Sequence, residues 1–117
     1  SKERVQFGHA VSEFQAIQWM FADMGTELEA AELMTFRAAF LRDAGRPYTR
    51  EAAMAKLFAS EAAMRATIKS VQVFGGYGYT EEYPAERYMR DAKLCEIGEG
   101  TSEVQRIIIA RDLIRGH

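Results

Sequence analysis

Apolar side chains recur at alternating spacings of three and four residues along the first third of the chain. These positions are Phe14, Ile17, Phe21, Met24, Leu28 and Ala31, and the acidic residues Asp23, Glu27, Glu29 and Glu32 fall off the stripe. The pattern is typical of a long amphipathic helix with one face against a core. The segment DAGRP at 43–47 should end this helix, because its glycine accepts a left-handed conformation and a proline follows.

The same spacing returns in a second stretch, at Ala53, Leu57, Ser60, Met64, Thr67 and Val71. Thr49 can cap this second helix, and Glu51 lies favourably in its first turn. The many alanines of the stretch permit a neighbouring helix to approach closely. We expect the second helix to pack antiparallel to the first.

Two shorter helices complete the pattern. The third is predicted from Pro84 to about Lys93, since proline is tolerated in a first turn. The fourth is predicted from Ser102 to Ile114, where Ser102 and Gln105 have the spacing of a capping box. No alternating segment is long enough to predict a sheet. The sequence therefore predicts an all-α fold, an antiparallel up-down helical bundle.

Size and charge narrow the class of protein. A chain of 117 residues and 13.2 kDa suits one domain or part of a larger protein. The net charge of -2, with basic and acidic residues interleaved, argues against a nucleic-acid partner. A single cysteine, Cys95, and only two histidines, His9 and His117, provide neither a disulfide nor a metal site, which fits a reducing cytoplasm. No apolar run is long enough to span a membrane, and no signal segment is recognisable.

A glycine-rich stretch, VQVFGGYGYTEEYP, follows the second predicted helix. A dinucleotide-binding fingerprint would need a strand before the glycines, so that motif does not apply. The glycines fit a turn that ends a helix, or a loop in which Gly75 and Gly76 let a bulky group such as a pyrophosphate approach their amides. Composition leaves both interpretations open.

A second stretch, EIGEGTSEVQR, places Glu99 between Gly98 and Gly100, just before the fourth helix. Two roles are open for Glu99. It is an ordinary loop carboxylate near the positive end of that helix, or it is a general base on a flexible loop. Elsewhere, a lone arginine such as Arg4 is typical of a solvated surface position. Gln15 and Gln72 lie among apolar neighbours in predicted helices, where hydrogen bonds between helices would satisfy their amides. The residues alone do not choose between these alternatives.

Taken in order, several segments resemble the acyl-CoA dehydrogenases: RVQFG at 4–8, Gln15, QVFGGYGYTEEYPAERYMRDAK at 72–93 and EIGEGTSEVQR at 96–106. The resemblance covers essentially the whole chain and is to the C-terminal helical domain of that family. It implies that residues 1–117 are a partial domain, with the first bundle helix missing and the N-terminal helical and middle β domains absent. A fragment, a separately produced domain or a split subunit would fit, and we expect it to be inactive alone.

The resemblance implies FAD as cofactor and assigns residues to it. Arg4, Phe7 and Gln15 would face the flavin nucleotide of a neighbouring subunit, with Arg4 near the pyrophosphate. Gln72, Gly75 and Gly76 would approach its adenosine diphosphate part. Thr101 and Glu103 would approach FAD from the other side of the active site. No residue is assigned to a metal.

The resemblance also implies α,β-dehydrogenation of an acyl-CoA, in which Glu99 removes the α proton while hydride leaves the β carbon for the flavin. The backbone N–H of Glu99 would help polarise the thioester carbonyl. Gly98 and Gly100 would border the substrate, and Gly98 stands where several medium-chain relatives have tyrosine. The implied partners are electron-transfer flavoprotein and further copies in a homotetramer, in the bacterial cytoplasm or, for a eukaryote, the mitochondrial matrix. A non-catalytic helical module for oligomerisation or interaction is the alternative.

Overall fold

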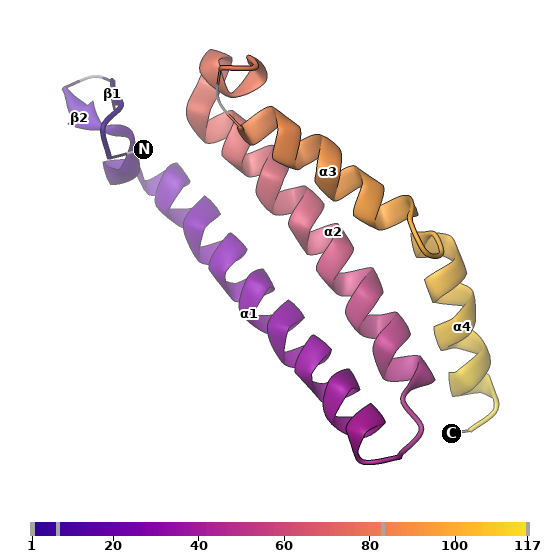
Figure 1. Ribbon diagram of the computed structural model, residues 1–117. Helices are drawn as coiled ribbons and strands as arrows, with labels where there is room; N and C mark the ends of the chain where they lie inside the picture. The colour runs from indigo at the N-terminus through magenta and orange to yellow at the C-terminus, as the bar shows by residue number, and fades with distance from the viewer. Residues whose placement is uncertain (1, 7, 83, 117) are drawn as a thin grey trace.

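The computed structural model describes residues 2–6, 8–82 and 84–116. Two long helices, α1 (Gln15–Asp43) and α2 (Thr49–Phe74), lie side by side and antiparallel, joined by a short turn (Figure 1). The shorter helices α3 (Ala85–Ile97) and α4 (Ser102–Ile114) follow one another along another side of α2. The predicted all-α, up-down bundle is confirmed, with α2 as the element that contacts each of the other helices.

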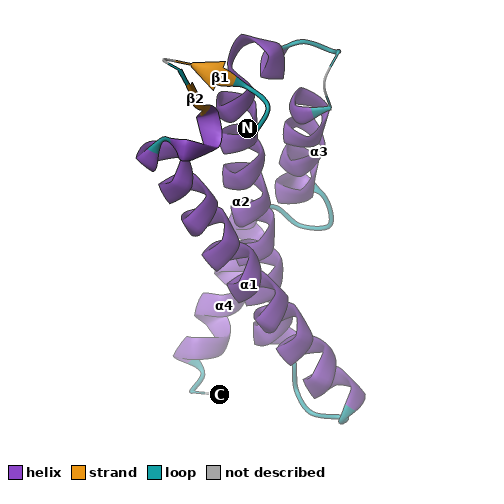
Figure 2. Cartoon of the chain, turned by 90° about the vertical axis from the view of Figure 1, so that its left-hand side faces the viewer, coloured by secondary structure: helices purple, strands orange, loops and turns teal. Residues whose placement is uncertain are grey.

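Small elements outside the four α-helices were not predicted. A hairpin of two-residue strands, β1 (Val5–Gln6) and β2 (His9–Ala10), precedes the 3-10 turn η1 (Val11–Glu13). A second 3-10 turn, η2 (Gly75–Tyr79), follows α2. Figure 2 shows the hairpin at the end of the bundle where α2 finishes. The expectation of no sheet was therefore wrong for this pair, which is too short to show alternation in the sequence.

Small side chains make the core. The buried apolar residues are Ala31, Ala38, Leu41, Ala53, Ala55, Ala62, Val73, Ala85 and Ala92. The expected role of alanine in close helix packing is confirmed. The predicted stripe of α2 lies buried or half-buried throughout, whereas in α1 Phe21 and Leu28 are 41% and 51% exposed. The face of α1 that contacts α2 carries Glu27 instead, which pairs with Arg65 at 3.0 Å.

The ends of the helices agree only in part with the capping residues predicted from the sequence. Gly45, with φ 69°, follows α1 as predicted. Tyr48, and not Thr49, occupies the N-cap position of α2, and α3 continues four residues beyond Lys93 to Ile97. The bounds of α4 are as predicted, but its cap is Thr101, whose Oγ accepts a hydrogen bond from the Val104 N–H at 3.2 Å. The proposed capping box on Ser102 was therefore wrong.

Candidate functional site

The loop between α3 and α4 carries Glu99 in a conformation that costs energy. Its φ is 55°, the only positive value at a non-glycine residue in the described part of the chain, and Gly100 follows with φ 102°. A left-handed conformation costs an L-residue about 1–2 kcal/mol. Such strained residues persist where surrounding contacts hold them, and they concentrate at functional sites. The loop geometry therefore favours a specific role for Glu99 over that of an ordinary surface carboxylate.

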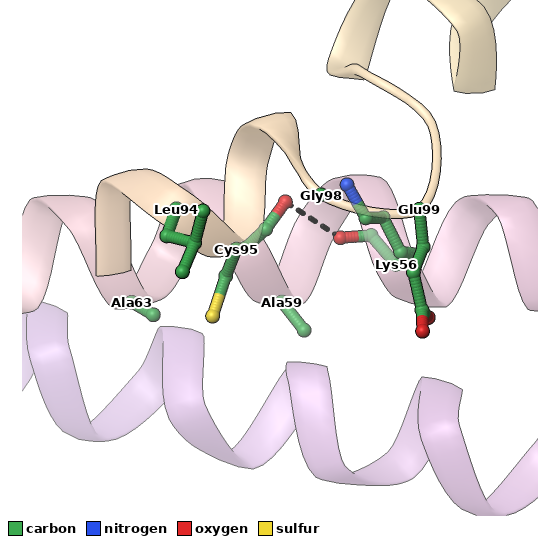
Figure 3. A pocket seen from close by; sticks show the side chains of 8 residues that line it. Lys56, Ala59, Ala63, Leu94, Cys95, Gly98 and Glu99 are labelled. Carbon is green, nitrogen blue, oxygen red and sulfur yellow. Dashed lines mark hydrogen bonds between the residues drawn. The ribbon is translucent and has the colours of Figure 1, made fainter. Parts of the chain in front are cut away.

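Glu99 lies at the edge of a largely apolar pocket of about 480 Å³ between α2 and α3 (Figure 3). The lining residues are Lys56, Ala59, Ser60, Ala63, Leu94, Cys95, Gly98 and Glu99. A volume of this order suits a small organic ligand. In Figure 3 the side chains of Leu94, Cys95 and Glu99 extend to the same side. Glu99 is exposed in this chain, so its carboxylate is placed to act as a general base on a substrate that occupies the pocket and covers it.

The two glycines beside Glu99 differ in how much room they leave for a side chain. A Cβ on Gly100 would lie 2.8 Å from Gln105 Nε2, and a Cβ on Gly98 would lie 3.2 Å from the Leu94 carbonyl oxygen. Gln105 is buried on α4 and donates from Nε2 to the Gly100 carbonyl at 3.5 Å. A side chain at Gly100 would thus be strained by its φ of 102°, whereas Gly98, with φ -67° and one close contact, leaves limited room for a side chain.

The start of α4 adds polar groups to this region. Thr101 caps the helix, and Glu103 is exposed in its first turn. The hydroxyl of Ser102 is buried and has no hydrogen-bond partner in the described structure. It borders a small cavity of about 140 Å³ that Lys93 and Arg106 also line. Lys93 and Arg106 are paired with Glu96 at 3.2 Å and Glu61 at 2.7 Å, so the unpaired Ser102 hydroxyl is the group that a polar ligand atom would satisfy here.

A second group of predicted residues lies at the end of α2. Arg4 Nη1 donates to the Val73 carbonyl at 3.1 Å, across 69 residues of sequence. The guanidinium rests on Gly75, whose φ is 64°, and a Cβ there would lie 2.5 Å from Arg4 Nη1. Gln72 and Gly76 are exposed beside this contact. The structure thus places Arg4 against the glycine turn. Two motifs that bind the same anion must lie this close together.

The remaining predicted residues are placed less directly. Gln15 is exposed and is the first residue of α1, which begins at the end of the bundle where α2 finishes (Figure 1). Phe7 lies outside the described residues. Gln72 is 16 residues beyond Lys56 on α2, which is about 24 Å along a helix. The predicted residues therefore form two separate groups, one around Glu99 and one around Gly75.

Sequence reasoning missed Lys56, which enters the Glu99 region from α2. Its Nζ donates to the Gly100 carbonyl at 2.7 Å and to the Glu96 carbonyl at 3.4 Å. The only local signal is a lysine within an alanine-rich stretch whose flanking positions are buried or half-buried. Its partners lie at least 40 residues away in the sequence, so no motif joins them.

Glu51 also proved different from the expected first-turn carboxylate. Its side chain is 9% exposed and lies 3.0 Å from Arg50 Nη2 and 3.6 Å from Arg37 Nη2, while Arg50 also pairs with Asp112 of α4 at 3.4 Å. Burial raises the pKa of Glu51, but hydrogen bonds from Arg50 and the backbone, with the charges of Arg50 and Arg37, outweigh burial and lower the pKa below its usual value. This group links α1, α2 and α4 and takes no part in lining the pocket beside Glu99.

Neither a metal centre nor a membrane helix is found among the described residues. They contain no group of three or more His, Cys, Asp or Glu side chains able to hold a metal ion. None of their helices combines the length and apolar character needed to cross a membrane.

Comparisons with a family model and with the sequences of known proteins agree on one protein family. Residues 1–114 match the family model described as "Acyl-CoA dehydrogenase, C-terminal domain". The chain is 57% identical over 115 residues to the probable acyl-CoA dehydrogenase YngJ of Bacillus subtilis strain 168, covering 98% of this chain and 30% of that protein. It is 50% identical over 117 residues to the mitochondrial short-chain specific acyl-CoA dehydrogenase of Bos taurus, covering 100% of this chain and 28% of that protein. The chain thus spans less than a third of the length of these relatives.

Solved structures agree with the sequence relatives. The fold matches butyryl-CoA dehydrogenase from Megasphaera elsdenii with a TM-score of 0.96 and 50% identity, over 98% of this chain and 30% of that one. It matches a chain in a structure of the electron transferring flavoprotein of Acidaminococcus fermentans with a TM-score of 0.96 and 57% identity, again over 98% of this chain and 30% of that one.

Proposed function

The chain belongs to the acyl-CoA dehydrogenase family as a C-terminal helical domain, and we propose that it serves a flavin-dependent enzyme that forms an α,β double bond in acyl-CoA thioesters. The observation that carries this proposal is Glu99, held at φ 55° beside an apolar pocket of about 480 Å³. The family resemblance implies a small residue at this loop position wherever the base lies on another helix, so a glutamate here favours the loop base.

Glu99 acts in two ways in this proposal. Its carboxylate removes the α proton of the acyl group and keeps it on a carboxylate oxygen. Its backbone N–H donates to the thioester carbonyl, which makes the α proton more acidic. Gly98 and Gly100 let the substrate approach the backbone, because neither places a side chain between the loop and the thioester. When FAD is bound, it supplies the acceptor for the hydride that leaves the β carbon.

The two groups of polar residues fit FAD. Arg4 lies over Gly75 and offers a guanidinium for the pyrophosphate, with the exposed Gln72 and Gly76 beside it. We assign this group, together with Phe7 and Gln15, to FAD held by a neighbouring subunit. Thr101 and Glu103 are assigned to FAD approached from the other side of the active site, where the buried Ser102 hydroxyl lacks a partner. The distance of about 24 Å along α2 supports two separate regions of contact.

Assembly into a homotetramer is part of the proposal. The outer side of α1 exposes Trp19, Leu33, Phe36 and Phe40 by about 59–66% each. Exposed apolar surface of this extent supports association between copies or with other parts of a longer chain. It is also what a non-catalytic oligomerisation module would show, so the surface by itself does not separate the two functions.

We assign the remaining flavin and substrate contacts to a middle β domain and an N-terminal helical domain of the complete protein. Electron-transfer flavoprotein is the proposed electron acceptor, which the similarity to a chain in a structure of such a flavoprotein supports. The proposed location is the cytoplasm of a bacterium, or the mitochondrial matrix for a eukaryotic chain, in keeping with bacterial and mitochondrial relatives.

The proposal is tested by anaerobic mixing of the complete flavoprotein with short-, medium- and long-chain acyl-CoA thioesters. We expect loss of the oxidised flavin absorbance with at least one chain length, and formation of the corresponding enoyl-CoA in equal amount. Stoichiometric binding of FAD without reduction by any of these thioesters would contradict the enzyme and favour the oligomerisation module.

A further inference from the structure

The strained loop needs contacts that hold it. Glu99 has a left-handed backbone between two glycines, and glycine leaves the chain more freedom than any other residue. A strained residue keeps its conformation only when surrounding groups determine it. The carbonyl of Gly100, directly after Glu99, accepts hydrogen bonds from side chains of two other elements, α2 and α4.

Two side chains donate to that carbonyl. Lys56 Nζ lies 2.7 Å from the Gly100 oxygen, a short charge-assisted hydrogen bond. Gln105 Nε2 donates to the same oxygen at 3.5 Å, a much weaker contact. Lys56 belongs to α2, the central helix of the bundle, so the loop is tied to the most extensively packed element.

Lys56 also holds the end of α3. Its Nζ donates to the Glu96 carbonyl at 3.4 Å, one of the last carbonyls of that helix. These carbonyls lack partners within the helix and carry partial negative charge, which a cation satisfies. One ammonium group thus spans Glu96 and Gly100, the residues on either side of the turn that carries Glu99.

The ammonium of Lys56 is committed to these carbonyls. No carboxylate lies within ion-pair distance of Lys56 among the described residues, and the side chain is half-buried. In Figure 3 its amino group and the Glu99 carboxylate extend in different directions. Lys56 therefore acts on the backbone of the loop and does not neutralise the carboxylate.

We propose that Lys56 is a positioning residue for Glu99, which bridges the end of α3 to Gly100 and so aims the Glu99 carboxylate and N–H at the acyl thioester. The inference rests on the proposed function, because it concerns the same base. Loss of the bridge leaves the glycine-flanked loop free to turn, and misplacement of a catalytic group by about 1 Å can lower a rate by about 10²-fold.

The test uses the complete flavoprotein with Lys56→Met, which keeps the aliphatic length but removes every donor. We expect kcat to fall by about 10- to 100-fold, with less than a threefold change in KM and unchanged FAD content. Exchange of an α-deuterium of the acyl-CoA with solvent should slow by a similar factor, because this exchange reports proton abstraction alone. Lys56→Arg, which retains charge and donors, should recover most of the rate.

Lys69→Met is the matched control, because Lys69 is a half-buried lysine of the same helix that faces Asp23 at 3.9 Å and not the loop. It should keep wild-type kcat and exchange. If Lys56→Met cannot be isolated folded, Lys56→Gln, whose amide is too short to span both carbonyls, should show the same loss.

The outcomes separate this inference from the proposed function. Wild-type kcat and exchange in a folded Lys56→Met or Lys56→Gln protein would overturn the role of Lys56, while a Glu99→Gln variant measured beside it remains inactive. A uniform loss in Lys56→Met, Lys56→Arg and Lys69→Met, with lower FAD content, would overturn it in favour of a purely structural role. Wild-type activity in Glu99→Gln would instead refute Glu99 as the base, while FAD binding without reduction by any acyl-CoA would refute the proposed function itself.

Discussion

Substitution of Gly75 by alanine changes the cofactor region at one well-defined point. Gly75 has φ 64°, and a Cβ there would lie 2.5 Å from Nη1, 2.7 Å from Nη2 and 3.0 Å from Cζ of Arg4. These are shorter than van der Waals contacts, so the Arg4 side chain must move. Because Arg4 is a flexible side chain, it can swing away, but the hydrogen bond to the Val73 carbonyl at 3.1 Å is then lost.

The expected cost has two parts. The backbone of Gly75, with φ 64° and ψ -141°, lies in a region that is essentially restricted to glycine, and holding an alanine there costs about 1–3 kcal/mol. Loss of the half-buried hydrogen bond, whose groups regain water, costs about 0.5–1.5 kcal/mol. We therefore expect the free energy of unfolding to fall by about 1.5–4.5 kcal/mol. If Arg4 contacts the FAD pyrophosphate, its displacement removes a charged contact of about 1.5–3 kcal/mol, and the Kd for FAD rises about 10- to 100-fold.

Titration of FAD into the apo form of the complete protein measures this change, with urea unfolding alongside. Gly25→Ala is the matched control, because Gly25 lies inside α1 and a Cβ there meets nothing within 4 Å. The control should gain about 0.5–1 kcal/mol of stability from the helix preference of alanine and keep its FAD affinity. An unchanged Kd in Gly75→Ala, despite the expected loss of stability, would refute the assignment of the Arg4–Gly75 contact to the cofactor.

Two further predictions concern stability and assembly. The pKa of Glu51 lies below its ordinary value of 4.5 in the folded chain, so its ion pairs stabilise the fold fully above about pH 4.5 and lose this effect as pH falls through the lowered pKa. Glu51→Gln should lower the free energy of unfolding at pH 7 by about 1–3 kcal/mol and flatten its decline in acid, whereas the exposed Glu32→Gln should do neither; equal acid slopes for wild type and Glu51→Gln would contradict this. The chain should also self-associate, and a Phe36→Ser, Phe40→Ser double variant should weaken association without loss of stability, because both rings are at least 60% exposed. Sedimentation showing only a 13.2 kDa species of the wild-type chain across the micromolar range would count against that expectation.

Helical periodicity predicted the long helices well, because burial against a neighbouring helix repeats every three to four residues. Its failures came where tertiary partners decided the outcome. In α1, the predicted face included Leu28, but the face against α2 instead carries Glu27, because Arg65 of α2 supplies an opposite charge. The hydrophobic spacing of α1 gives no information about this charged partner on α2.

The helix caps and the candidate site were also predicted only in part, because each depends on contacts made in the folded chain. Thr101 and Ser102 are both good N-cap residues, and only the backbone geometry selects Thr101 and buries the Ser102 hydroxyl. The family motif singled out Glu99, but neither its positive φ nor the contact of Lys56 with Gly100 follows from a pattern of neighbours. Contacts across 44 residues of sequence depend on how α2 packs against α3, which the sequence alone did not provide.

The most direct test of the account is the rate of flavin reduction in a single turnover of the complete enzyme carrying Glu99→Gln. Glutamine keeps the size of the side chain and the backbone N–H of residue 99, but it cannot accept the α proton. We predict that reduction by the preferred acyl-CoA slows by at least about 10²- to 10⁴-fold, while FAD content and the spectral change on acyl-CoA binding persist. Reduction at a near-normal rate would contradict Glu99 as the base and place that base on a carboxylate elsewhere in the complete protein.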